Sequence, residues 1–108
     1  MFRYTVACTF TDPAVADEWV AWLRDEHLRE VCAAGARSAE VVACHDHPLR
    51  VEVRYHFPSR AAFQAYERDH APRLREAGLA RFPLERGLAY ERSTGAVVAA
   101  YDAFGGAA

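Results

Sequence analysis

The stretch "LRVEVRYHF", residues 49–57, decides the fold because its side chains alternate between apolar and polar. Valine, tyrosine and phenylalanine occupy the odd positions from 51 onward, while charged or polar residues occupy the even positions. Successive side chains of a β-strand point to opposite faces, so this alternation predicts a strand with one apolar face. Residues 2–10, "FRYTVACTF", repeat the pattern with their apolar side chains at the even positions. We therefore expect two strands that share one apolar face of a sheet.

Each of these strands is followed by a segment that predicts a helix. Asp12 and Pro13 supply an N-cap and a first-turn proline, and Gly35 suits a left-handed helix end. The second helix is expected to begin after Ser59, which serves as its N-cap. Pro72 lies inside this second helix and lacks a backbone N–H, so it predicts a kink or a break there.

Two further segments predict the remaining strands of the sheet. They are residues 37–46, "RSAEVVACHD", and residues 87–98, "GLAYERSTGAVV". The resulting order, β-α-β-β-α-β, is that of an α+β, ferredoxin-like two-layer sandwich. We assign residues 1–94 to this domain and residues 95–108 to a C-terminal tail that docks loosely on it.

The polar face of the predicted sheet is expected to carry no helices. In a two-layer domain the apolar face takes the helices, so the polar face meets either solvent or another molecule. A chain of 108 residues buries only a modest core, and we therefore favour a second copy and a two-fold homodimer. The residues expected at this interface are Arg3, Thr5, Glu52, Arg54 and His56.

Composition and charge argue against several classes of partner. The formal net charge is −2, from 13 basic and 15 acidic residues, so no basic excess favours nucleic acid. No apolar run approaches the length of a membrane span, and the first residues do not form a signal peptide. Three cysteines without a C-x-x-C pair do not suggest a disulfide framework. We expect a cytoplasmic protein without a membrane or nucleic-acid partner.

Motifs for metal or cofactor chemistry are weak or missing. Residues 45–47, "HDH", alternate potential ligands, but no third and fourth ligand follow at a fixed spacing. The sequence also lacks a G-x-G-x-x-G, a P-loop, a G-x-S-x-G and an H-E-x-x-H motif. We therefore expect neither a metal ion nor a cofactor.

Both predicted helices carry a histidine in an otherwise apolar stripe. Helical spacing of three and four residues defines the first stripe: Ala16, Trp19, Val20, Leu23, His27 and Val31. The second stripe comprises Phe63, Tyr66, His70 and Leu74. Such histidines either line a small-molecule pocket or fill the core while hydrogen-bonded to a neighbour. Both interpretations remain open at this point.

The pocket interpretation assigns roles to individual residues. His27 is the predicted acid/base, because imidazole transfers protons near neutral pH, and Tyr55 or His70 would orient it. The predicted ligand-binding residues are Tyr4, Trp19, Trp22, Leu23 and Tyr66. The ligand would be small and either aromatic or apolar. The alternatives are a non-catalytic dimeric module with a packed core and, as a weaker one, haem binding through His27 or His70.

Two segments carry a resemblance to a known family. They are "WLRDEHLREVCAAGA", residues 22–36, and "VEVRYHFPSRAAFQAYERDHAPRLREAGLARF", residues 51–82. Together they resemble the small bacterial proteins grouped as domain of unknown function 4286, and the resemblance extends to about Ala89. It implies the dimeric α/β barrel, in which two ferredoxin-like sheets pack face to face and each subunit can hold a pocket. That superfamily includes cofactor-independent monooxygenases, muconolactone isomerases and haem-binding proteins, but the family itself implies no residue roles.

Overall fold

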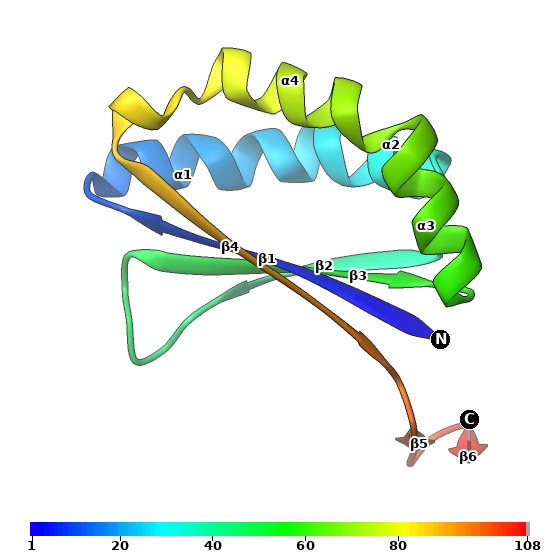
Figure 1. The fold of residues 1–108 in the computed structure, drawn as a ribbon. Helices are drawn as coiled ribbons and strands as arrows, with labels where there is room; N and C mark the ends of the chain where they lie inside the picture. The colour runs from blue at the N-terminus through cyan, green and yellow to red at the C-terminus, as the bar shows by residue number, and fades with distance from the viewer. Residues whose placement is uncertain (108) are drawn as a thin grey trace.

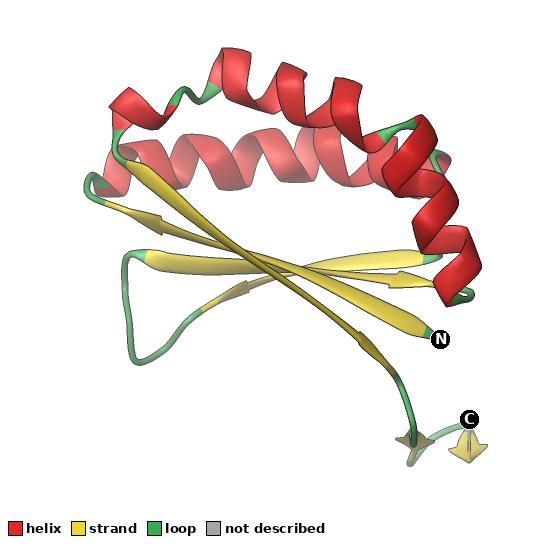
Figure 2. Cartoon of the chain, viewed as in Figure 1, coloured by secondary structure: helices red, strands yellow, loops and turns green. Residues whose placement is uncertain are grey.

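The computed structural model describes residues 1–107, whose main feature is a four-stranded antiparallel sheet (Figure 1). The strands are β1 (Phe2–Phe10), β2 (Ser38–Ala43), β3 (Arg50–Phe57) and β4 (Leu88–Ala96), in the order β2-β3-β1-β4. All helices lie on one face of this sheet, and the other face carries none (Figure 2). The predicted ferredoxin-like α+β sandwich is therefore confirmed.

The first helical segment is continuous but widens in its middle. It comprises α1 (Pro13–Trp22), the π-helical turn η1 (Leu23–His27) and α2 (Leu28–Ala33). The carboxylate of Asp12 accepts a hydrogen bond from the N–H of Ala14 at 2.9 Å and so caps α1. Gly35 adopts a φ of +134°, a conformation that favours glycine, just after the segment ends.

The second helical segment breaks where proline predicts a break. It comprises α3 (Arg60–Asp69) and α4 (Ala71–Arg81), and a short 3-10 turn, η2 (Leu84–Arg86), follows them. Ser59 caps α3 by accepting a hydrogen bond from the N–H of Ala62 at 3.1 Å. Pro72 lies in the first turn of α4, where its missing N–H costs no helical hydrogen bond.

The register of β1 with β3 fixes which side chains meet the helices. Tyr4 pairs with Tyr55, and Cys8 with Val51, on the helix-facing side. This side forms the core with the apolar stripes of the helices, and Phe57 and Leu23 are 0% and 1% exposed. The strict alternation predicted for β3 is visible in its burial, which switches at every residue.

The open face of the sheet holds the residues predicted for the dimer interface. Thr5 pairs with Arg54, and Arg3 with His56, so these side chains share the open face with Glu52. Their placement agrees with the sequence, whereas their role in a dimer stays a prediction. Within residues 1–107 no helix has the length and apolar character needed to cross a membrane.

The chain beyond β4 leaves the body of the domain. β4 extends two residues past the boundary at residue 94, because residues 95 and 96 still pair with the start of β1. Val97 then donates a backbone hydrogen bond to the carbonyl of Met1 at 2.9 Å. The short strands β5 (Tyr101–Asp102) and β6 (Gly106–Ala107) form a separate hairpin away from the main sheet (Figure 1). The last residue of the predicted tail, Ala108, lies outside the described residues.

Candidate functional site

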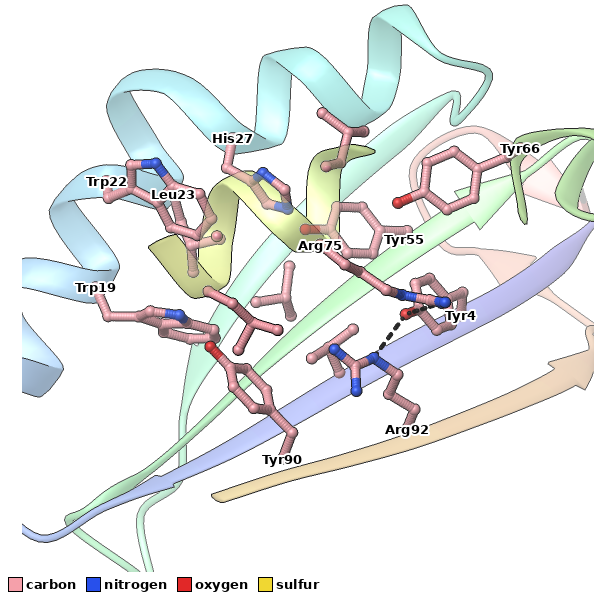
Figure 3. A pocket seen from close by; sticks show the side chains of 15 residues that line it. Tyr4, Trp19, Trp22, Leu23, His27, Tyr55, Tyr66, Arg75, Tyr90 and Arg92 are labelled. Atoms are coloured by element: carbon pink, nitrogen blue, oxygen red, sulfur yellow. Dashed lines mark hydrogen bonds between the residues drawn. The ribbon is translucent and has the colours of Figure 1, made fainter. Parts of the chain in front are cut away.

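A cavity of about 60 Å³ lies between the helices and the sheet (Figure 3). All the residues predicted for the pocket line this cavity except His70. The predicted residues that do line it are Tyr4, Trp19, Trp22, Leu23, His27, Tyr55 and Tyr66. The cavity reaches solvent beside Leu79, whose side chain is 46% exposed, and beside the exposed Arg92.

His27 enters the cavity from the π-helical turn η1. In this turn the N–H of Leu28 bonds to the carbonyl of Leu23, five residues back, a local widening that is frequent at functional sites. The imidazole stacks on Trp22 with ring centroids 4.3 Å apart and an interplanar angle of 19°. Burial desolvates the imidazole and lowers the pKa of His27 to about 4. At neutral pH it is therefore uncharged, with one nitrogen that donates and one that accepts.

The indole of Trp22 lies over the cavity because a glycine on the facing helix leaves room for it. A Cβ at Gly78 of α4 would lie 3.3 Å from the Trp22 ring, which is tighter than an ordinary contact. Gly78 therefore allows the indole to lie directly against the α4 backbone. The ring of Phe82 lies 5.5 Å from the ring of Trp22. This packing fixes the indole on which His27 stacks.

Three of the four tyrosines that line the cavity lie close together: Tyr4 and Tyr55 on the sheet and Tyr66 on α3. Tyr4 stacks on Tyr55 with centroids 5.8 Å apart, and Tyr66 lies 6.4 Å from Tyr4. Burial raises the pKa of Tyr66 to about 12 and raises the pKa of Tyr55 well above its usual value. Tyr55 and Tyr66 therefore stay protonated at neutral pH and can donate hydrogen bonds into the cavity (Figure 3).

Two arginines that sequence reasoning missed meet at the hydroxyl of Tyr4. Arg75 Nη2 lies 3.2 Å from this oxygen and Arg92 Nε lies 3.1 Å from it (Figure 3). Arg92 faces the helices because it pairs with Val6, a helix-facing position of β1. A signal was available in the alternation of β4, since Leu88, a core residue, stands four positions before Arg92 on the same face.

The structure does not bring His70 to this cavity, and this corrects the expectation that it lines the pocket and can orient His27. His70 lies at the break between α3 and α4, with a φ of −129° that is not helical. A residue at such a break no longer follows the helical stripe that includes Phe63 and Tyr66. Its Nδ1 atom lies 2.8 Å from Nη1 of Arg73 instead.

The cavity does not fit a haem. The cavity volume of about 60 Å³ is far smaller than the volume of a porphyrin ring. The imidazole of His27 also stacks on an indole rather than projecting into open space. Among residues 1–107, no three histidine, cysteine, aspartate or glutamate side chains are grouped as a metal site would require. His45, Asp46 and His47 are exposed in the loop between β2 and β3.

The chemistry of the cavity follows from its two unlike sides. His27 offers a neutral nitrogen that can accept a proton, although a pKa near 4 makes it a weak base in the empty cavity. The side nearer the sheet offers N–H and O–H donors from arginine and tyrosine. This arrangement can take up a proton at His27 and stabilise negative charge on an oxygen atom.

The sheet order, the single helical layer and the cavity between the layers define a ferredoxin-like α+β protein with a candidate ligand site. Within this class, the chain belongs to the family described as domain of unknown function (DUF4286), whose sequence model matches residues 1–93. No curated protein matches the chain with significance. The family resemblance expected from the sequence is confirmed.

Solved structures with the same fold include dimeric proteins and an oxygenase. A dimeric ferredoxin-like protein from an uncultured marine organism is 14% identical, with a TM-score of 0.70 over 94% of this chain and 99% of that one. HapK from Hahella chejuensis is 20% identical, with a TM-score of 0.65 over 95% and 99%. A variant of SnoaB, a cofactor-independent oxygenase from Streptomyces nogalater, is 12% identical, with a TM-score of 0.63 over 92% and 94%. At these identities the likeness concerns the fold.

Proposed function

We propose that the protein binds a small aromatic or apolar molecule in the cavity between helices and sheet, with His27 as the acid/base. The observation that carries this proposal is the neutral imidazole of His27, stacked on Trp22 in a cavity that tyrosines and arginines also line. The fold is shared with a cofactor-independent oxygenase, which supports a reaction of the monooxygenase type. An isomerase reaction, as in the muconolactone isomerases that the family resemblance implies, is the other reaction type proposed. Both reaction types can begin when a base removes a proton from the substrate.

The proposed roles divide between the two layers. His27 accepts the proton, and the electron pair left on the substrate resides on an oxygen atom held by donors near Tyr4. Tyr55, whose hydroxyl stays protonated, is the residue proposed to orient His27 or the substrate from β3. His70 has no part in this proposal because it does not line the cavity.

The size of the cavity limits what it admits. A cavity of roughly 150 Å³ holds a benzene ring, so a volume of about 60 Å³ requires that side chains move for an aromatic ring to bind. Leu79 is 46% exposed, so its side chain can move with little loss of core packing. A ligand is therefore proposed to displace Leu79 as it binds.

The same proposal includes a homodimer formed through the open face of the sheet, with Arg3, Thr5, Glu52, Arg54 and His56 at its interface. Its support is a helix-free face that carries ion pairs, and a protein of the same fold that is described as dimeric. A cytoplasmic location in a bacterium is also proposed, because Cys8, Cys32 and Cys44 are free thiols, as in reducing compartments. Sedimentation equilibrium of the purified chain tests the dimer.

The experiment that tests ligand binding uses benzamide as a neutral aromatic probe. Benzamide is expected to shift the backbone amide signals of Gly78 and Leu79 in heteronuclear NMR spectra. His27→Leu, of similar volume, is expected to weaken this binding about fivefold, the scale of one lost hydrogen bond. His70→Leu removes the histidine outside the cavity and serves as the matched control.

The outcomes separate a ligand site from a packed module. Weaker binding by a folded His27→Leu protein, with His70→Leu unchanged, supports the site. If neither benzamide nor its anionic analogue benzoate moves the amides of the wild-type protein, or if His27→Leu binds benzamide as tightly as the wild type does, the non-catalytic dimeric module is the better description of this chain.

A further inference from the structure

We infer that the ligand of this cavity is an anion, with a carboxylate or similar planar oxyanion held by Arg75 and Arg92 beside Tyr4. The inference rests on the proposed function, since it assigns the chemical class of the molecule that the same cavity binds. It adds a binding site for negative charge that the aromatic lining alone does not imply.

The charges around the cavity are unbalanced. Its lining includes two arginines and no aspartate or glutamate, in a chain whose formal net charge is −2. Arg75 has one carboxylate partner, Glu67, at 2.8 Å, and Glu67 is not a lining residue. Arg92 makes no ion pair with any of residues 1–107, and it lies 5.1 Å from the ring centroid of Tyr90. The cavity therefore holds at least one positive charge without a negative partner.

The hydrogen bonds around the Tyr4 hydroxyl leave some N–H and O–H donors without an acceptor. Tyr4 accepts from both arginines at 3.2 Å and 3.1 Å, which occupies the two lone pairs of its hydroxyl oxygen. Its own O–H is then free to donate elsewhere. Arg75 Nε is buried without a hydrogen-bond partner among the described residues, and such a buried donor is costly to leave unpaired. Only acceptors are missing here, and a carboxylate supplies them.

A carboxylate satisfies this arrangement better than a neutral group does. A neutral phenol is a weak partner for two guanidinium groups, whereas charge-assisted bonds to a carboxylate are about twice as strong. Tyr66 also faces this part of the cavity with a protonated hydroxyl, because burial raises its pKa to about 12. Arg92 is exposed, so a charged ligand can approach it without first losing all of its water.

The test compares benzoate with benzamide, which have the same ring and nearly the same shape but differ in charge. Binding is followed by NMR titration of the Gly78 and Leu79 amides in the wild-type protein, in Arg92→Met and in Arg73→Met. Arg73 belongs to the same helix as Arg75, is exposed and does not line the cavity, so Arg73→Met removes one charge elsewhere. We expect the wild-type protein and Arg73→Met to bind benzoate about tenfold more tightly than benzamide, and Arg92→Met to lose that preference.

A conservative variant distinguishes the loss of positive charge in Arg92→Met from a loss of folded structure. Arg92→Lys restores the positive charge without the planar fork, so it is expected to recover part of the preference that Arg92→Met loses. Equal binding of the two probes, or an unchanged preference in Arg92→Met, overturns the anion site while the aromatic site of the proposed function stands. If neither probe shifts the cavity amides, the proposed function fails, and the anion site fails with it.

Discussion

The two faces of the sheet treat positive charge in opposite ways. On the open face Arg54 lies 3.8 Å from Glu40 and 3.4 Å from Glu52, so the guanidinium is matched by carboxylates. On the helix-facing side Arg75 and Arg92 both donate to the hydroxyl of Tyr4. Of the two arginines only Arg75 has a carboxylate partner, Glu67. A face with matched charges can be covered by a second copy of itself, whereas unmatched charge in the cavity is the feature on which the proposed anion site rests. Stability, pH dependence and dimerisation each test this division.

Substitutions at two neighbouring residues of β3 test the difference between the two faces of the sheet through the free energy of unfolding. Phe57 is 0% exposed beneath the helices, and truncation of such a side chain typically costs about 3–5 kcal/mol. Phe57→Ala is therefore expected to lower the free energy of unfolding by about that amount in urea titrations. His56 points to the open face, and His56→Ala is expected to cost less than about 1 kcal/mol. Similar losses for the two variants would mean that both faces are buried alike.

The pH dependence of stability tests the burial of His27. Its pKa is about 4 in the folded protein and near 6.5 when the chain unfolds, so the unfolded chain binds more protons between these values. The free energy of unfolding therefore falls as the pH drops through this window, by about 3 kcal/mol from this group. His27→Leu removes this contribution, and the difference between its curve and that of the wild type isolates it from other titrating groups.

Chemical denaturation at pH 7, 6, 5 and 4 measures both curves. The wild type is expected to lose stability relative to His27→Leu as the pH falls, mostly between pH 6.5 and 4. Parallel curves would show that His27 titrates normally and is in contact with water, which would remove the reason to place a neutral imidazole in the cavity.

The sequence predicted the fold because its decisive signals are local. Alternation in β1 and β3, the caps at Asp12 and Ser59, and the break near Pro72 depend on residues close together in the chain. Each depends on the backbone preferences of a few neighbouring residues. The layers and the sheet order follow from these signals together with the short connections between elements.

The site was only partly predictable because it depends on contacts between distant segments. The pairing of Arg75 and Arg92 at Tyr4 joins residues 71 and 88 positions from it in the chain. His70 illustrates the opposite error, since a helical stripe assumes an unbroken helix and the break at this residue removes it. Alternation along β4 indicates the face that Arg92 takes, but only the tertiary structure shows that Arg75 and Arg92 meet at Tyr4 with one carboxylate partner.

The dimer interface is tested by removing one matched charge. Arg54→Met leaves Glu40 and Glu52 without their common partner on the open face. We expect the dimer dissociation constant to rise about tenfold in sedimentation equilibrium, equivalent to about 1.4 kcal/mol. Arg24→Met is the control, because Arg24 pairs with the adjacent Asp25 on an exposed helical surface. An equal effect of both variants would place the interface elsewhere.

The smallest effect on protomer stability concerns a single hydroxyl on the open face. Thr5 is 8% exposed, and its Oγ1 atom is buried without a hydrogen-bond partner in one protomer. Valine has nearly the same shape without the hydroxyl. In an isolated protomer Thr5→Val should therefore raise the free energy of unfolding, by about 0.5 kcal/mol, because an unpaired polar atom is removed.

In the dimer the same substitution should have the opposite sign. A second copy packed on the open face can supply the partner that the Thr5 hydroxyl lacks, and Thr5→Val then loses a hydrogen bond worth about 0.5–1.5 kcal/mol. We expect the dimer dissociation constant to rise roughly threefold to tenfold, while unfolding of the dilute protomer becomes slightly harder. Sedimentation equilibrium and urea unfolding across a range of protein concentrations separate the two effects. A stabilised protomer with unchanged dimerisation would show that the open face meets water, and the matched charges of that face would then be only a solvated surface.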